Sequence, residues 1–376
     1  MRILSCFALI LFGSWLSGCD NAPDIQASGK VYNIAFMGEE QGDGNALEGV
    51  LAANAAEPLL DNGDRLEIVR VHHASAGKEI PEALKVHVKG GEISAILLGG
   101  NSKTILQLKH EIDAFQIPAL ALKATHPEVT EEVEYISQLS FDDERQAQAA
   151  ALFMRDELSL NRAAVLFSDI DPHSAYLGQV FRTTFEAAGG EVDEFTIFSQ
   201  LNQAMLQRLK DKDTQIIYMP LEPDQVFHVL EQLSKLNWKP VIMAADGLHS
   251  GVIQAYSQRL HELNGMYVTD LYSNSDDFVS VAEFVKKVAG LHDEMFNDSA
   301  STNTALGVEG YQVIKYAMNR CPDRNNSACI NKEIRSIKNQ QGVISRFSIL
   351  ANGKAVRPIY INTLQDGKLE LVVKVN

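Results

Sequence analysis

The sequence predicts an α/β protein with two doubly wound lobes, and three observations support this fold class. Short apolar runs of the kind that form buried parallel strands alternate with amphipathic helical segments along most of the chain. The chain has 376 residues, of which 45% are hydrophobic, so it exceeds the usual size of one domain and can bury a large core. It contains no internal repeat and no low-complexity tract. Strands and helices that alternate in this way are typical of parallel sheets covered by helices.

The first half of the chain predicts one long helix among several strands. In the segment 46–60, Leu47, Val50 and Leu51 fall on one helical face. The strands are short apolar or alternating runs, and we expect them at 31–37, 65–72, 93–98 and 117–122.

The second half repeats the alternation of strand and helix. Buried strands are expected at 163–167, 215–219 and 240–244, and helices at 174–188, 223–236, 251–263 and 278–290. In the last of these helices, Phe278, Val281 and Val285 share a face, while Glu283 and Lys287 pair four positions apart on the other.

The N-terminus reads as an export signal with a lipid-attachment site. Arg2 precedes an apolar run from Ile3 to Trp15, which is too short to span a bilayer and has the proportions of a signal peptide. Leu16-Ser17-Gly18-Cys19 resembles the lipobox of bacterial lipoproteins, and the alternative is an ordinary signal peptide with a chance cysteine. We therefore expect a signal peptide over 1–18, a lipid on Cys19 and a small, polar tether over 19–30.

Charge and cysteine usage agree with an exported protein. The net charge of −16 would repel a phosphate backbone, so nucleic acid is excluded as a partner, and membrane association requires the anchor rather than a basic face. Asp20 resembles the signal that retains Gram-negative lipoproteins at the periplasmic face of the inner membrane. Cys6 leaves with the signal peptide, and we expect Cys321 and Cys329 to form a disulfide. A zinc site is the alternative, but the spacing is wrong and no histidine lies nearby.

A series of short motifs resembles one family. The motifs are Ile34–Gly38, the strand and turn Ile93–Ser102, Ile117–Pro127, the crossover Tyr135–Asp142 with Gln146-Ala147, Ala163–Asp169, Phe347–Gly353, Arg357–Tyr360 and Asp366–Lys368. Their order and spacing resemble the type I periplasmic-binding proteins, in particular the leucine/isoleucine/valine-binding branch. The resemblance implies two Rossmann-like lobes joined by a three-segment hinge. Lobe 1 would comprise 31–141 and 271–355, and lobe 2 would comprise 142–270 and 356–376.

The chain departs from the family pattern at three positions. Gln138 stands where the family usually has Arg, and Gly100 where it has Pro. Leu221 stands where a ring that contacts the ligand is common. These differences bear on the ligand more than on the fold.

The resemblance implies a ligand site in the cleft between the lobes, at the carboxyl ends of the strands. Ser102 follows a strand and starts a helix, and the resemblance assigns its hydroxyl to the ligand's α-carboxylate; the alternative is a plain helix cap worth about 1 kcal/mol. Thr125 matches a second carboxylate-binding hydroxyl, or is a turn residue before Pro127. Lys123 matches a backbone-contact position, where its cation would meet an acidic ligand or point to solvent.

Asp246 is the position that most directly suggests ligand chemistry. It follows the strand 240–244, where the family places a carboxylate that holds the ligand's ammonium; the alternative is an Asp-Gly turn with Gly247. Ser102 and Asp246 together would clamp a zwitterion across the two lobes. Asp43, with Gln41 and Gly42, and Tyr272 are further candidates for lining the cleft, or are ordinary loop residues.

Patterns of catalysis are absent from the sequence. Gly99–Thr104 suggests a P-loop, but Ser102 stands where Gly must precede the Lys. Gly247–Gly251 misses the spacing of a hydrolase elbow by one position. The sequence therefore predicts a protein that is not an enzyme and has no cofactor or metal ion.

Three functions fit these features. The first is the receptor of an ABC importer, which captures an amino acid or a similar small polar ligand and presents it to a permease. The second is a sensory or regulatory lipoprotein of the same fold that acts on an inner-membrane signalling or cell-wall partner. The third is a structural activator of cell-wall enzymes that has kept the fold and lost the ligand, a possibility to which Leu221 points.

Overall fold

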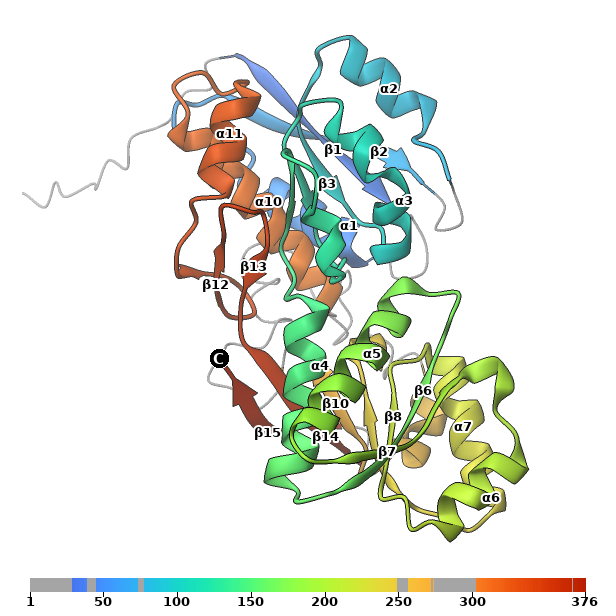
Figure 1. The fold of residues 1–376 in the computed structure, drawn as a ribbon. Coiled ribbons are helices and arrows are strands. Elements are labelled where there is room, and N and C mark those ends of the chain that lie inside the picture. The colour runs from blue at the N-terminus through green and yellow to red at the C-terminus, as the bar shows by residue number, and fades with distance from the viewer. Residues whose placement is uncertain are drawn as a thin grey trace, which may run out of the picture.

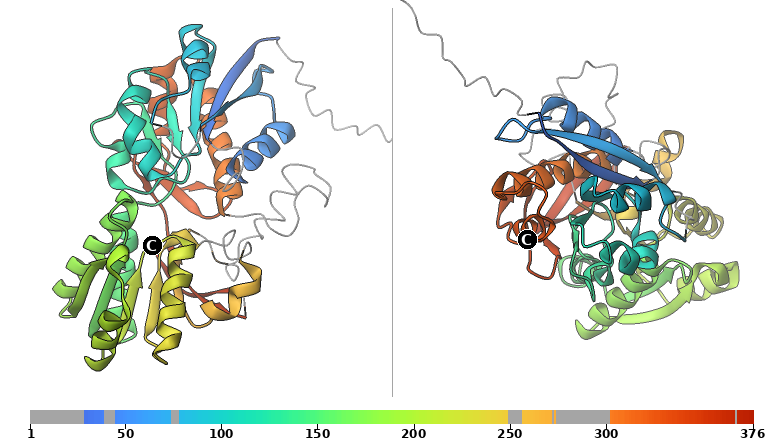
Figure 2. Two further views of the ribbon diagram at one scale, coloured as in Figure 1. Left: turned by 90° about the vertical axis from the view of Figure 1, so that its right-hand side faces the viewer. Right: turned by 90° about the horizontal axis from the view of Figure 1, so that it is seen from above.

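The structure, a computed structural model, describes residues 29–38, 45–73, 78–248, 256–271, 273, 302–366 and 368–376. These residues form two α/β lobes, one above the other in Figure 1, each with helices on both faces of its sheet (Figure 2). The predicted fold class is confirmed. The signal peptide, Cys19, Asp43, Tyr272 and the helix expected at 278–290 lie outside the described residues.

Lobe 1 is built on a five-stranded parallel sheet with the order β2-β1-β3-β4-β5. All residues of β3 are buried because helices cover both faces of this central strand. The strands are β1 (Val31–Gly38), β2 (Arg65–His72), β3 (Ile93–Leu98), β4 (Ala119–Ala121) and β5 (Ile136–Gln138). The helices are α1 (Asn45–Ala56), α2 (Glu82–Lys89), α3 (Ser102–Asp113), the single turn η1 (Pro127–Thr130), α10 (Thr302–Arg320) and α11 (Ser327–Ile334).

Helices α1 and α10 cross closely enough for their backbones to touch. A Cβ atom at Gly49 would lie 2.0 Å from the carbonyl oxygen of Thr304, and one at Gly307 would lie 2.0 Å from that of Ala46. Glycine is therefore required on both helices. Helix α1 ends at Ala56, earlier than the predicted residue 60, because Pro58 cannot continue a helix.

Lobe 2 is built on a seven-stranded sheet with the order β15-β14-β10-β9-β8-β6-β7. Strands β6 to β10 are parallel, whereas β14 and β15 add to the edge in antiparallel orientation. The strands are β6 (Arg162–Phe167), β7 (Glu191–Ile197), β8 (Ile216–Met219), β9 (Val241–Ala244), β10 (Tyr267–Asp270), β14 (Ile359–Gln365) and β15 (Lys368–Val375). The helices are α4 (Asp143–Leu152), which continues as η2 (Phe153–Glu157), α5 (Pro172–Ala187), η3 (Phe198–Gln200), α6 (Gln203–Asp211), α7 (Pro223–Lys235), η4 (Asp246–Leu248) and η5 (Ser257–Leu263).

Part of the helix expected at 251–263 has a different form. Residues 257–263 form the 3₁₀ helix η5 rather than an α-helix. In a 3₁₀ helix, side chains three positions apart lie above one another, and here Leu260 and Leu263 both pack on the lobe 2 core. The apolar spacing that suggested an α-helix therefore also fits the tighter helix.

The chain passes between the lobes after β5, after β10 and after the small sheet β11 (Gln340–Gln341), β12 (Arg346–Ile349) and β13 (Ala355–Val356). This sheet lies beside the junction of the lobes (Figure 1). At the last passage Arg357 donates to Glu309 of α10 over 2.7 Å, and both side chains are buried. Burial with a charged partner fixes the start of the passage to lobe 1.

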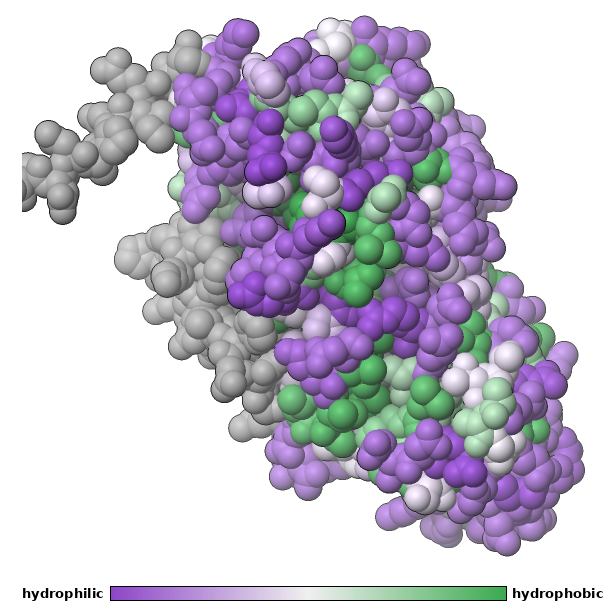
Figure 3. Space-filling model, turned by 60° about the vertical axis from the view of Figure 1, so that its left-hand side comes forward, coloured by the Kyte–Doolittle hydropathy of each residue, from purple (hydrophilic) through white to green (hydrophobic). Residues whose placement is uncertain are grey.

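Two further features concern the periphery. Cys321 and Cys329 form a disulfide that joins the end of α10 to α11, with a Cα–Cα distance of 5.9 Å. Polar side chains dominate the face in Figure 3, and apolar residues emerge between them on both lobes. Across the described ranges, no helix is both long enough and apolar enough to span a bilayer.

Candidate functional site

A cavity of about 140 Å³ lies between the lobes at the carboxyl ends of their strands. Such edges are where α/β sheets bind ligands, because strand ends and helix starts meet there. Lobe 1 contributes Asn101, Ser102, Lys123, Thr125 and Asn303, and lobe 2 contributes Asp171, His173, Pro220, Leu221, Glu222, Ala245, Asp246 and Gly247. The structure thus brings together four of the six ligand-contact residues expected from the sequence; Asp43 and Tyr272 are not described.

Ser102 ties the start of α3 to the loop after β4. Its Oγ accepts the backbone N–H groups of Thr125 and His126 at 3.1 and 3.2 Å. The residue that caps α3 is Asn101, whose side chain accepts the N–H of Thr104, so Ser102 is not the plain cap considered above. A hydroxyl that accepts two hydrogen bonds retains its own O–H as a donor.

Gln138, at the end of β5, holds the loop that carries Thr125. The Gln138 amide donates to the carbonyl oxygens of Ala124 and His126 at 3.0 and 3.1 Å. The side chain is buried, so these bonds replace the water that the two carbonyls would otherwise bind. Gln138, which stands where the resembling family usually has Arg, therefore helps to shape the lobe 1 side of the cavity.

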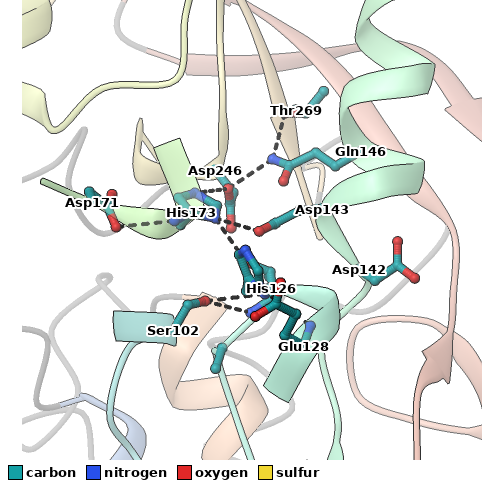
Figure 4. Close-up of polar contacts among 12 residues, drawn as sticks. Ser102, His126, Glu128, Asp142, Asp143, Gln146, Asp171, His173, Asp246 and Thr269 are labelled. Atoms are coloured by element: carbon teal, nitrogen blue, oxygen red, sulfur yellow. Dashed lines mark hydrogen bonds and ion pairs between the residues drawn. The ribbon is translucent and has the colours of Figure 1, made fainter. Parts of the chain in front are cut away.

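On the lobe 2 side, His173 lies between two carboxylates (Figure 4). Its Nδ1 is 3.0 Å from Oδ2 of Asp143, and its Nε2 is 3.4 Å from Oδ1 of Asp246. Nδ1 also lies 3.1 Å from Oγ1 of Thr125, which belongs to lobe 1. The imidazole is thus one of the points at which side chains from both lobes meet.

Helix α4 supplies the support behind this histidine. Asp143 and Gln146 are three positions apart, so both lie on one side of the helix, where they are buried behind the cavity wall. The Gln146 amide donates to Oδ1 of Asp246 and to Oγ1 of Thr269, each at 2.8 Å. Asp246 is therefore held by a neutral donor and a histidine at the same oxygen.

Burial and charge shift the pKa values in this cluster. Burial raises the pKa of Asp143, and the neighbouring imidazole offsets this only in part. Burial by itself lowers the pKa of His173, but the charges of Asp143 and Asp246 and their hydrogen bonds outweigh it and raise the pKa well above its usual value. Burial lowers the pKa of His126, which lies edge-on to Tyr176 across the lobes at 4.8 Å. These shifts favour a cationic His173 and a neutral His126.

The two walls of the cavity differ in charge. Lobe 1 presents Lys123 and the N-terminal end of α3, which is the positive end of the helix dipole. Lobe 2 presents the carboxylates Asp171, Glu222 and Asp246 around the apolar side chain of Leu221, which is buried. A dipolar ligand with a carboxylate towards lobe 1 and a cation towards lobe 2 matches this distribution.

Sequence reasoning missed His173, Asp143 and the role of Gln146 in the site. A signal for His173 was present, because Asp171-Pro172-His173 follows a buried strand and opens a helix, as Ser102 does in lobe 1. Asp143 and Gln146 carried no comparable signal, since their partners are far away in the sequence.

A two-lobed α/β fold with a polar cavity between the lobes defines the architecture of a ligand-binding receptor. The family model described as "Periplasmic binding protein" matches residues 42–368, and the chain belongs to this family. The family comprises solute-binding receptors rather than enzymes, and membership implies an extracytoplasmic location. No curated protein sequence gave a significant match to the chain.

Solved structures with this fold span nearly the whole chain. A leucine binding protein from Thermotoga maritima is 21% identical, with a TM-score of 0.79 over 92% of this chain and 99% of that one. A branched-chain amino acid transporter substrate binding protein from Streptococcus pneumoniae, in complex with isoleucine, is 18% identical, with a TM-score of 0.77 and coverage of 92% and 99%. An ABC transporter solute binding protein from R. palustris, in complex with 4-hydroxybenzoate, is 17% identical, with a TM-score of 0.77 and coverage of 92% and 97%.

Proposed function

We propose that this protein is an extracytoplasmic receptor that binds an amino acid or a similar small polar ligand and delivers it to an ABC importer. The observation that carries the proposal is the cavity in which Ser102 and Lys123 of lobe 1 face Asp246 of lobe 2. Relatives of this fold bind leucine, isoleucine or 4-hydroxybenzoate, all of which carry a carboxylate.

Ligand recognition follows from the charges of the two walls. The ligand carboxylate would accept the Ser102 O–H near the positive end of α3, and an ammonium would donate to Asp246 in a charge-assisted hydrogen bond. Leu221, which lines the cavity, would contact an apolar part of the ligand. A ligand that contacts both walls favours the closed arrangement, since its contacts are complete only when the lobes meet. The hinge would then lie at the expected lobe boundaries, near residues 141–142, 270–271 and 355–356.

We also propose that a lipid on Cys19 tethers the receptor to the membrane. The support is the Leu16–Cys19 motif behind a short apolar run. In cells that express Cys19→Ala, the protein should leave the membrane fraction, and mass spectrometry of the N-terminal peptide should show no acyl chains. Unchanged membrane association of this variant would contradict the tether and leave the receptor function untouched. The alternative function is that of a sensory lipoprotein with the same fold. Its partner would be a membrane sensor protein rather than an ABC permease.

Thermal unfolding against a panel of amino acids, amides and short carboxylates tests the receptor function. A ligand at about 100 times its dissociation constant should stabilise the protein by about 2.7 kcal/mol. The panel includes L-leucine, L-isoleucine and 4-hydroxybenzoate. Stabilisation that is lost in Asp246→Ala supports binding in the cavity, whereas a flat panel would contradict the proposal and favour a protein that binds partners only.

A further inference from the structure

His173 connects the residues on which the proposed ligand recognition depends. Asp246, the proposed acceptor of the ligand's ammonium, lies 3.4 Å from Nε2, and Thr125 of the opposite lobe lies 3.1 Å from Nδ1. Asp143, whose side chain is fully buried, lies 3.0 Å from the same Nδ1. The 19% exposure of the His173 side chain leaves it at the cavity wall, with its ring nitrogens directed at protein groups.

The positions of the two carboxylates select one protonation state of the ring. A neutral imidazole has one N–H, so one of its nitrogens is a bare acceptor. Such an acceptor would face either Asp143 or Asp246 within 3.4 Å, lone pair against lone pair. When both carboxyl groups are ionised, an imidazolium donates from both nitrogens and satisfies both of them, so it is the ring state that fits this geometry.

Among the described side-chain contacts of the ring, the ionisable partners are carboxylates, while Lys123 and Glu222 line the same cavity. Helix α4 contributes Asp143 and the loop after β9 contributes Asp246. The loop after β4 contributes Thr125 and the neutral His126, whose Nδ1 accepts the N–H of Glu128. On its own helix, Asp171 caps the backbone N–H of His173. Burial, and then the charges of Asp143 and Asp246, raise the pKa of the nearby Tyr218 well above its usual value, so this phenol is uncharged.

We propose that His173, as an imidazolium, is a positioning residue that orients Asp246 for the ligand and links it to Thr125 of the other lobe, so that ligand affinity depends on the proton of His173. The proposal rests on the proposed receptor function. Without the proton, Asp143 and Asp246 would repel the bare ring nitrogen. Asp246 would then lose its charged donor at Nε2 while the Gln146 amide still donates to it, and the link between the lobes would weaken. His173 orients other groups in this account and need not touch the ligand.

The protonation of His173 can be measured without any ligand. In the mature protein labelled with ¹³C at the histidine rings, and with His173→Gln used for assignment, we expect the ring signal of His173 to titrate well above the usual range of histidine. Asp143→Asn should lower that midpoint, because it removes one of the two carboxylates while keeping the shape of the side chain. A midpoint near 6.5 that Asp143→Asn leaves unchanged would overturn the proposal.

The dependence of binding on the proton is tested by titration calorimetry with L-leucine and 4-hydroxybenzoate across a pH series. Wild-type affinity should fall as the pH rises through the midpoint measured for His173. His173→Gln keeps a neutral hydrogen-bonding side chain, and we expect it to bind at least tenfold more weakly at neutral pH with a flat profile. Asp211→Asn, on the exposed end of α6, is the control for loss of a carboxylate on the same lobe.

The results of these experiments distinguish the proposed role of His173 from the proposed receptor function. Binding with the same pH profile in the wild type and in His173→Gln would overturn the role of His173 and leave the receptor function standing. A complete absence of binding by both probes and by every compound of the unfolding panel would overturn the receptor function and the proposal together. If His173→Gln unfolds, Asp143→Asn takes its place, since a merely structural contact would not shift the pH midpoint of binding.

Discussion

The lobe 1 wall of the cavity and the lobe 2 wall are held in different ways. On lobe 1, Ser102 and Gln138 hold the loop of Thr125 through hydrogen bonds to backbone groups. On lobe 2, the side chains of Gln146 and His173 contact the Asp246 carboxylate, and Asp143 in turn contacts His173. A wall fixed by backbone contacts should resist changes of pH, whereas a wall fixed by ionised side chains should respond to them. The difference teaches that backbone contacts hold the lobe 1 wall in shape, whereas charged side chains hold the lobe 2 wall.

The largest loss of ligand affinity should come from a substitution on the lobe 2 wall. Asp246→Ala removes the proposed partner of the ligand cation and one neighbour of His173, so ligand affinity should fall by about 100-fold, or roughly 3 kcal/mol. Titration calorimetry with the panel compound that stabilises the protein most measures this loss. Asp211→Ala is the matched control on the surface of α6, and an equal loss in both variants would remove the basis for placing charge recognition in lobe 2.

On lobe 1, replacing Ser102 should lower the stability of the fold in addition to removing a proposed donor to the ligand carboxylate. Ser102→Ala leaves the buried N–H groups of Thr125 and His126 without their acceptor, which should destabilise the fold by about 1–2 kcal/mol. Chemical denaturation measures the change, with the exposed Ser234→Ala of α7 expected to stay within roughly 0.5 kcal/mol. Equal stabilities of the two variants would show that backbone contacts do not hold this wall.

The pH dependence of stability sharpens the comparison. Because the pKa of His173 is raised in the folded state, its contribution is fully present below the unfolded value of about 6.5 and is lost as the pH rises through the folded value. Wild type should therefore lose stability in this window relative to His173→Gln, while Ser102→Ala should run parallel to wild type. Denaturation curves at several pH values test this, and parallel curves for all three proteins would contradict it.

The smallest change in stability is expected at Tyr218, which lies behind the lobe 2 wall. The buried hydroxyl of Tyr218 has no hydrogen-bond partner among the described residues, and the ring stacks on Phe181 at 4.1 Å. Tyr218→Phe retains the stacking and removes only this hydroxyl, so stability should change by less than about 1 kcal/mol in either direction. A loss well above this value would reveal a polar partner for the hydroxyl and extend the network of Asp143 and Gln146.

The difference between the walls also explains what sequence reasoning could reach. The alternation of strands and helices predicted two α/β lobes, because this pattern follows from local periodicity and burial. Ser102, Thr125 and Asp246 could be singled out, since each follows a buried strand whose end has a known place in such folds. The pairing of His173 with Asp143 and Asp246 spans 30 and 73 positions and has no local signature. Likewise, the apolar spacing of residues 257–263 fits both an α-helix and a 3₁₀ helix, so it could not predict the 3₁₀ form of η5.

The topology of the lobes has a consequence for biosynthesis. Strand β14 pairs with β10, and β15 pairs with β14, so the lobe 2 sheet receives its last two strands from the C-terminal end of the chain. Lobe 1 likewise lacks α10 and α11 until residues beyond 302 have been made. Neither lobe can therefore complete its core before residues 302–375 have been synthesised, so the last part of the chain is needed for both lobes to fold.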